Sequence, residues 1–221
     1  MKAHKRELVQ EYLISQNYLP VERPISFFMA GSPGAGKTEF SKTFVQRLNA
    51  ASPKSPTFRL DPDEIRSFLP QYTGSNSQEM QAAASLGVSE LFSYCHKKSL
   101  SVVIDGTFSR PTSLENVRRA VNRDRTVVIL YVYQDPLVAW KYTQQREAIE
   151  GRNIPKQAFI DAYFGAYQNM IRLKELYTNS VQLVVIENDV INKVKETHID
   201  VPDIRDILKI NFTPMSLEKK L

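Results

Sequence analysis

The sequence predicts an α/β fold with a five-stranded parallel sheet that is flanked by helices on both faces. Five short apolar runs, rich in β-branched and aromatic residues, alternate with longer segments of helical spacing. The apolar runs are continuous rather than alternating, which is typical of strands buried on both faces. A chain of 221 residues with 42% hydrophobic and 24% charged residues is long enough for one well-buried domain.

The expected strands end at turn signals or polar stretches, and they cover residues 25–30 (ISFFMA), 57–60 (TFRL), 100–105 (LSVVID), 126–133 (TVVILYVY) and 181–187 (VQLVVIE). The expected helices lie between the strands, at residues 37–50, 62–69, 78–98, 113–122, 136–150 and 155–177. Strand and helix in regular alternation predict a parallel sheet wound by helices.

The chain divides into three parts around this pattern. Residues 1–24 form a basic N-terminal segment with helical spacing, and residues 25–187 hold the predicted domain. The pattern weakens in residues 188–221, which we expect to form a C-terminal appendage. No apolar run approaches the roughly 18 residues that span a membrane, and the N-terminus lacks the apolar core of a secretion signal. The single cysteine, Cys95, excludes an internal disulfide and is typical of a protein in a reducing compartment. Together these features lead us to expect a cytoplasmic protein without a membrane partner.

The segment GSPGAGKT at residues 31–38 fits G-x-x-x-x-G-K-[ST] at every fixed position, directly between an expected strand and an expected helix. Glycines allow successive N–H groups to point inward around an anion, and the helix N-terminus adds partial positive charge. Lys37 can reach the β- and γ-phosphates, and the Thr38 hydroxyl can hold Mg²⁺. We therefore expect a nucleoside triphosphate, ATP or GTP, to be bound by Gly31, Ser32, Pro33, Gly34, Ala35, Gly36, Lys37 and Thr38.

Asp61 and Asp63 follow the second expected strand, in the sequence RLDPDEIRS. Open α/β sheets bind ligands at the carboxyl ends of their strands, so both aspartates lie at the ligand-binding edge. A carboxylate there can accept the proton of a hydroxyl that attacks a γ-phosphorus. A turn with a helix N-cap explains either aspartate equally well. These residues alone leave both interpretations open.

Asp105 and Thr107 follow the third expected strand, in the sequence VVIDGT. An acidic residue after three apolar ones, beside the phosphate loop, has a Walker-B-like position and could orient Mg²⁺ through water. Thr107 would reach into the same cleft. The alternative for this segment is a structural turn.

Arg146 and Arg152 lie on and just after the expected helix 136–150, in the sequence QQREAIEGRNIP. Two arginines beside a glycine break are typical of a lid that folds over phosphates and neutralises charge on the transferred group. Taken singly, either arginine is more often a solvated helix residue.

The phosphate loop, LDPDEIRSFLPQY, VVIDGT and an arginine helix leading into GRNIPKQAF occur in the order that resembles the zeta toxin family of P-loop kinases. The resemblance covers about residues 25–175 and implies a P-loop kinase-like fold that uses ATP and Mg²⁺. It also implies that Asp63 is the catalytic base and that Arg146 and Arg152 contact the ATP phosphates, with Lys37 as the fourth catalytic residue.

The same resemblance implies an acceptor and a partner. Family members phosphorylate the 3′-hydroxyl of a UDP-N-acetylsugar, and a paired antitoxin blocks their nucleotide site. A family glutamate that contacts the sugar nucleotide corresponds to Asp105, which is one methylene shorter, and Glu90 matches a second such glutamate if a one-residue gap is allowed. We therefore expect UDP-N-acetylglucosamine as the leading acceptor, with Asp105, Thr107 and Glu90 around it.

Two other functions stay open from the sequence. The first keeps phosphoryl transfer but moves it to a nucleic-acid end, a nucleoside or NAD, because polynucleotide kinases also place an arginine near their acidic base, here Arg66 near Asp63. The net charge of +5 and the pI of about 9.2 are compatible with such anionic partners. The second is a nucleotide-gated binding module that carries out no transfer chemistry.

Overall fold

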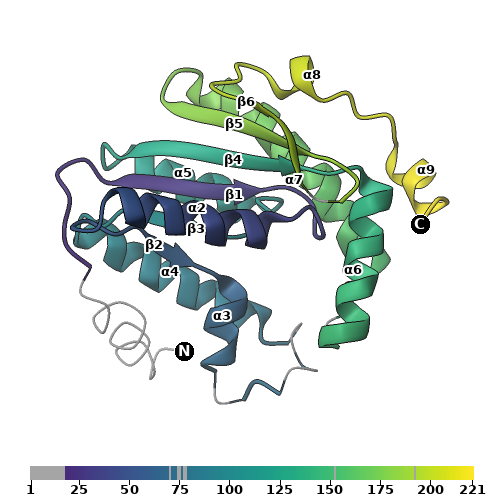
Figure 1. Cartoon of the computed structure of the whole chain (residues 1–221), viewed down its shortest axis with the longest axis horizontal. Coiled ribbons are helices and arrows are strands. Elements are labelled where there is room, and N and C mark those ends of the chain that lie inside the picture. Colours follow the sequence, from purple (N-terminus) through teal and green to yellow (C-terminus); the bar gives the residue numbers. More distant parts are fainter. Residues whose placement is uncertain (1–17, 70, 74–75, 77–78, 152, 192) are drawn as a thin grey trace.

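One mixed sheet organises the computed structural model, which describes residues 18–69, 71–73, 76, 79–151, 153–191 and 193–221 (Figure 1). Within these residues the strand order is β2-β3-β1-β4-β5-β6. The strands are β1 (Ile25–Ala30), β2 (Phe58–Leu60), β3 (Val102–Ile104), β4 (Thr126–Tyr133), β5 (Val181–Asn188) and β6 (Val194–His198). All neighbouring strands are parallel except β5 and β6, which are antiparallel.

The α/β fold expected from the sequence is therefore confirmed, with one difference in the sheet. The five expected strands are present, and β6 adds a sixth from the segment 188–221, which was expected to be an appendage. The helical segment expected at residues 1–24 falls largely outside the described residues, and residues 18–24 lead into β1 without helix.

Within the described residues, the six expected helices lie where the spacing of apolar residues predicts them, with ends that differ by a few residues, and two short helices that were not expected lie in the segment 188–221. They are α2 (Lys37–Ala51), α3 (Pro62–Ser67), α4 (Gln81–Lys97), α5 (Pro111–Val121), α6 (Pro136–Glu150), α7 (Lys156–Tyr177), α8 (Ile204–Ile207) and α9 (Pro214–Glu218). Proline occupies the first helical turn of α3, α5, α6 and α9, where its missing N–H costs no hydrogen bond. None of the helices within the described residues is long and apolar enough to cross a membrane.

Successive side chains of each strand point to opposite faces of the sheet, so the two faces carry separate cores. Phe28 and Ala30 of β1 belong to the larger core, which α4, α5 and α7 cover. Phe27 and Met29 belong to the smaller core, against which α2 packs Phe44 and its neighbours. Figure 1 accordingly shows α2 in front of the sheet and α5 and α7 behind it.

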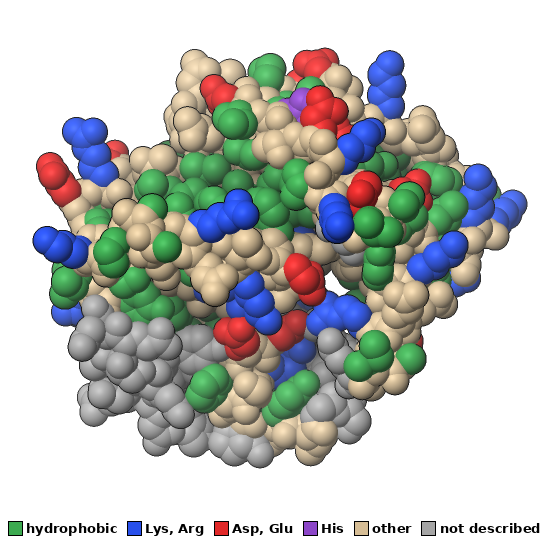
Figure 2. All heavy atoms as spheres, viewed as in Figure 1, with side chains coloured by type: hydrophobic (Ala, Val, Ile, Leu, Met, Phe, Trp, Pro, Cys, Tyr) green, Lys and Arg blue, Asp and Glu red, His purple; other side chains and the backbone are tan. Residues whose placement is uncertain are grey.

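On the α2 side the cover is incomplete. A groove of about 420 Å³ runs beside α2 across β1, β4, β5 and β6, and its lining is mostly apolar. Figure 2 shows hydrophobic side chains exposed across this part of the sheet.

The segment after β5 returns to the body of the protein. Val201 donates its N–H to the carbonyl of Leu183 in β5 at 2.8 Å, and Leu217 of α9 is buried against α6 and α7. Tyr167 of α7 also donates its hydroxyl to the carbonyl of Leu208 at 3.0 Å.

Two glycines of the loop after β1 lie too close to neighbouring backbone for any side chain. A Cβ on Gly31 would lie 2.1 Å from the carbonyl oxygen of Val132 in β4, and one on Gly34 would lie 2.1 Å from that of Ala139 in α6. Both residues have positive φ, at 129° and 73°. The loop is therefore fixed to the sheet and to α6 by positions that glycine alone can occupy.

We expect Gly31→Ala to lower the free energy of unfolding by about 2 kcal/mol or more, because the new methyl group must displace the β4 backbone. The melting temperature of the nucleotide-free protein should fall by roughly 4–8 °C. Gly106→Ala is the matched control, because a Cβ at Gly106 meets nothing within 4 Å. Equal melting temperatures for the two variants would show that the loop is not packed as described.

Candidate active site

The phosphate loop joins β1 to α2 at the carboxyl edge of the parallel strands. Lys37, the first residue of α2, is 8% exposed and donates its Nζ to the carbonyl of Ser32 at 2.6 Å. Gly36 is the N-cap of α2, with φ of 84°, and no side chain caps this helix end. The lysine and the N-terminus of α2 thus direct positive charge toward the loop, as a site for phosphate requires.

Asn188, at the end of β5, supports the loop from the other side. Its Nδ2 donates to the carbonyl of Ala35 at 2.9 Å, over a separation of 153 positions in the sequence. Thr107 anchors the start of the loop, because its carbonyl accepts the N–H of Gly31 at 3.1 Å. The Thr107 hydroxyl also shares a hydrogen bond of 2.8 Å with the Ser109 hydroxyl. Thr107, which was expected to lie beside the substrate that accepts the phosphate, is therefore next to the phosphate loop.

Arg59 of β2 is the centre of an ion cluster beside this loop. Its Nη2 lies 2.6 Å from Asp61 Oδ2 and 2.7 Å from Asp105 Oδ2, and its Nη1 lies 2.6 Å from Glu64 Oε1. Its Nε donates to the Ser41 hydroxyl of α2 at 3.0 Å. Side chains from β2, α2, α3 and the loop after β3 therefore meet at one guanidinium.

The cluster is mostly shielded from water, and its charges depend on one another. The Arg59 and Asp61 side chains are 10% exposed and that of Asp105 is 5% exposed. Burial raises the pKa of Asp61, the Asp105 charge raises it further, and Arg59 opposes both effects. Burial alone would lower the pKa of Arg59, but Asp61 and Asp105 raise it above its ordinary value. Arg59 therefore stays charged at any pH that the fold survives.

The two aspartates after β2 have different roles in the structure. Asp61 is the N-cap of α3 and accepts the N–H of Asp63 at 2.8 Å, in addition to its ion pair with Arg59. The Asp63 side chain is 40% exposed and accepts Nη1 of Arg66 at 3.1 Å. Asp61 thus fits the N-cap interpretation, whereas the exposed Asp63 carboxylate is not needed to cap the helix. The Arg66 side chain is 3% exposed.

The other predicted residues lie on separate elements. Glu90 lies on α4. Burial lowers the pKa of Arg119 on α5, and the charge of Glu90 partly opposes this shift. Arg146 is half-buried on α6, and Arg152 lies outside the described residues. In Figure 1 α6 runs down from the end of β4 on the side that faces α3, and Figure 2 shows acidic and basic side chains gathered between them.

Two side chains beside the loop, Thr38 and Asp105, carry oxygen donors of the kind that a magnesium ion prefers. Mg²⁺ prefers oxygen ligands, and Thr38 contributes a hydroxyl in the first turn of α2. Asp105 contributes a carboxylate whose Oδ2 already accepts from Arg59 and from the Ser41 hydroxyl, the latter at 2.7 Å. An ion held by Thr38 and Asp105 would therefore share the Asp105 carboxylate with Arg59.

Sequence reasoning did not identify Arg59 or Asn188. A charged residue within the short apolar run TFRL, two positions before an aspartate, is the signal that indicates a buried ion pair at Arg59. Asn188 carries no comparable signal, because its partner Ala35 is brought near only by the sheet.

Three solved structures are similar to this fold. A chain of the PezAT chromosomal toxin-antitoxin system of Streptococcus pneumoniae aligns with a TM-score of 0.73 and 14% identity, over 100% of this chain and 95% of that one. AvrRxo1-ORF1:AvrRxo1-ORF2 with ATP aligns at 0.59 with 16% identity, over 90% of this chain and 65% of that one. The Pnkp1/Rnl/Hen1 RNA repair complex aligns at 0.50 with 18% identity, over 74% of this chain and 48% of that one.

The sequence comparisons give one family and no individual relative. Curated protein sequences show no significant match. The zeta toxin family matches residues 9–199, which is most of the sequence and includes every element from β1 to β6. The structural likenesses, at these low identities, show the shared fold, and the family match agrees with the resemblance seen in the motifs. The chain belongs to the zeta toxin family.

Proposed function

We propose that the protein is an ATP-dependent kinase that phosphorylates a hydroxyl of a nucleotide-linked small molecule, with UDP-N-acetylglucosamine as the leading acceptor. The family and the fold support a P-loop kinase-type function, and the similar structure that contains ATP supports ATP as the donor. The observation that carries the proposal is that the acidic residues differ in burial and in their ion pairs. Asp61 and Asp105 are buried against Arg59, whereas Asp63 offers a 40% exposed carboxylate at the same edge of the sheet.

In this proposal Asp63 accepts the proton of the acceptor hydroxyl while that oxygen attacks the γ-phosphorus and the bond to the ADP oxygen breaks. Lys37 and the N-terminus of α2 stabilise the negative charge on the phosphates. Arg146 of α6 and Arg152 bind the same phosphates. Mg²⁺ held by Thr38 and Asp105 would neutralise charge on the β- and γ-phosphates.

The acceptor would bind on the side of Asp63 that faces the loop after β3. Thr107 is fixed there by its bond to Gly31, and Asp105 by Arg59 and Ser41. Because Asp105 is one methylene shorter than the family's glutamate, the acceptor must approach the sheet more closely or be reached through water. An antitoxin that covers the nucleotide site is the proposed protein partner, supported by the toxin-antitoxin system to which the similar S. pneumoniae chain belongs.

The experiment that tests the acceptor is incubation with labelled ATP, Mg²⁺ and a panel of UDP-N-acetylsugars, nucleosides, NAD and oligonucleotides. We expect UDP-N-acetylglucosamine to gain the mass of one phosphate and the label to leave ATP at the same rate. If only the oligonucleotide became labelled, a nucleic-acid end would replace UDP-N-acetylglucosamine as the proposed acceptor. If no acceptor became labelled, the protein would instead be a nucleotide-gated binding module.

A nucleic-acid end is the second candidate acceptor, favoured by the contact between Arg66 and Asp63 and by the structural likeness to a chain of an RNA repair complex. Binding to oligonucleotides would then weaken steeply with added salt, because each phosphate contact releases counterions. Binding no tighter than to free nucleotide would reject this candidate.

Replacing the proposed base should separate transfer from nucleotide binding. We expect Asp63→Asn to lower kcat by roughly 10²–10⁴-fold, because the acceptor hydroxyl loses its general base. The dissociation constant for ATP should stay within about twofold, since Asp63 does not belong to the phosphate loop. Phosphate transfer and ATP binding are measured on the same preparation, with Asp206→Asn as the control because Asp206 is an exposed residue of α8. Turnover at the wild-type rate would remove Asp63 from the mechanism.

The position of Asp63 also depends on Arg59, which forms ion pairs with the flanking residues Asp61 and Glu64. We expect Arg59→Met to lower the free energy of unfolding by about 3 kcal/mol or more, because Asp61 and Asp105 are then buried without their counter-ion. Arg118→Met removes an ion pair with Glu115 whose side chains are 58% and 50% exposed, and it should leave the free energy of unfolding nearly unchanged.

Urea unfolding compares these two variants, and Arg59→Lys, which keeps the charge but loses the forked geometry, should lie between them. If Arg59→Met and Arg118→Met were equally stable, the cluster would not hold β2, α2 and α3 together.

A further inference from the structure

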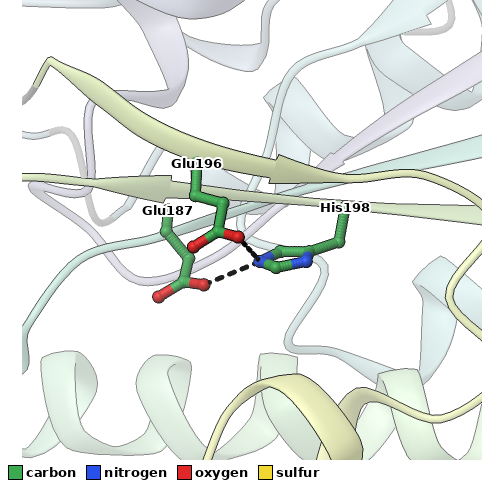
Figure 3. A group of neighbouring side chains, drawn as sticks. All are labelled: Glu187, Glu196 and His198. Atoms are coloured by element: carbon green, nitrogen blue, oxygen red, sulfur yellow. Dashed lines mark hydrogen bonds and ion pairs between the residues drawn. The ribbon is translucent and has the colours of Figure 1, made fainter.

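Three side chains that bind metals well converge on the β5–β6 hairpin. Glu187 ends β5, and Glu196 and His198 lie on β6. His198 Nε2 is 2.9 Å from Glu187 Oε1 and 3.8 Å from Glu196 Oε1, and one atom from each residue lies within 4.8 Å of the others. Figure 3 shows all three side chains projecting to the same side of the two strands.

The strand register explains this convergence and makes it costly without a cation. Glu187 lies directly opposite Glu196, and His198 lies opposite Val185, two positions along the same face. Like charges directly opposite in an antiparallel pair are destabilising. The ion pairs described for both carboxylates go to the same imidazole, His198. A β-bulge between Glu187 and Asn188 shifts the register at this point, and bulges of this kind re-aim side chains.

The arrangement suits a first-row divalent metal. Zn²⁺ binds imidazole nitrogen and carboxylate oxygen at about 2.0–2.2 Å, which places tetrahedral ligand atoms about 3.4 Å apart. The distances of 2.9 and 3.8 Å already bracket this value. Glu187 and His198 are 20% and 23% exposed and thus partly fixed, whereas Glu196 is 58% exposed and can move toward a metal while water fills the fourth position.

We propose that Glu187, Glu196 and His198 form a Zn²⁺-type site that fastens β6 to β5. An imidazole ligand favours Zn²⁺ and related transition metals over Mg²⁺, so this site and the nucleotide site take different ions. The site would also stabilise the turn that follows Glu187. Asn188, at the end of β5, bonds to the phosphate loop, and in the turn that follows the carbonyl of Val190 accepts the Tyr142 hydroxyl of α6 at 3.2 Å.

The test is calorimetric titration of the full chain with Zn²⁺, in a buffer that contains millimolar Mg²⁺. We expect one saturable site, with affinity reduced at least tenfold in His198→Gln and in Glu187→Gln. Glu218→Gln is the matched control, because Glu218 is an exposed carboxylate of α9 that does not belong to the cluster. Its affinity should equal that of the wild type.

Two further measurements keep the proposal falsifiable if a variant folds poorly. Glu196→Gln changes the most exposed ligand, so its circular dichroism should match the wild type while its Zn²⁺ affinity falls. Saturating Zn²⁺ should also raise the melting temperature of the wild type and leave that of His198→Gln unchanged. Absence of Zn²⁺ binding, or equal affinity in the wild type and His198→Gln, would overturn the proposal.

Discussion

The positive charge of the Arg59 guanidinium allows the acidic residues of the candidate site to lie close together in the folded protein. Asp61 and Asp105 come from the ends of neighbouring strands, and their carboxylates would repel each other in a setting with little water. Arg59 lies between them at 2.6 and 2.7 Å and also bonds to α2 through Ser41. Because the phosphate loop opens α2, the acidic edge and the nucleotide site are joined through this one side chain.

The parallel sheet brings these residues together. Parallel strands end at a common edge, so residues that follow β1, β2, β3 and β5 meet there although the sequence separates them widely. Gly31 bonds to Thr107, and Ala35 bonds to Asn188, so the loop is held from both neighbouring connections. In the proposed mechanism, holding the loop on both sides would lower the cost of aligning a phosphate with an acceptor hydroxyl.

The sequence contained the fold and the donor site because both depend on local patterns. Continuous apolar runs indicated five strands, and the phosphate loop is a contiguous motif with a required context. Strand β6 was not predicted because its sequence VKETH is polar and mostly exposed, so it shows no pattern of buried residues. The Arg59 cluster and the role of Asn188 escaped for a different reason: they depend on partners 46 and 153 positions away, which only the tertiary fold supplies. The proposed roles of Asp63, Arg146 and Arg152 stay predictions.

A crystal structure with a non-hydrolysable ATP analogue and Mg²⁺ is the most direct measurement of the central claim, that the loop presents a γ-phosphate to an acceptor activated by Asp63. We predict that Lys37 Nζ leaves the Ser32 carbonyl for the terminal phosphate, and that Asp63 faces the γ-phosphorus across a space that one hydroxyl would fill. We also predict that Arg59 keeps its bonds to Asp61 and Asp105. A nucleotide bound away from residues 31–38, or a γ-phosphate separated from Asp63 by the Arg59 cluster, would contradict this account.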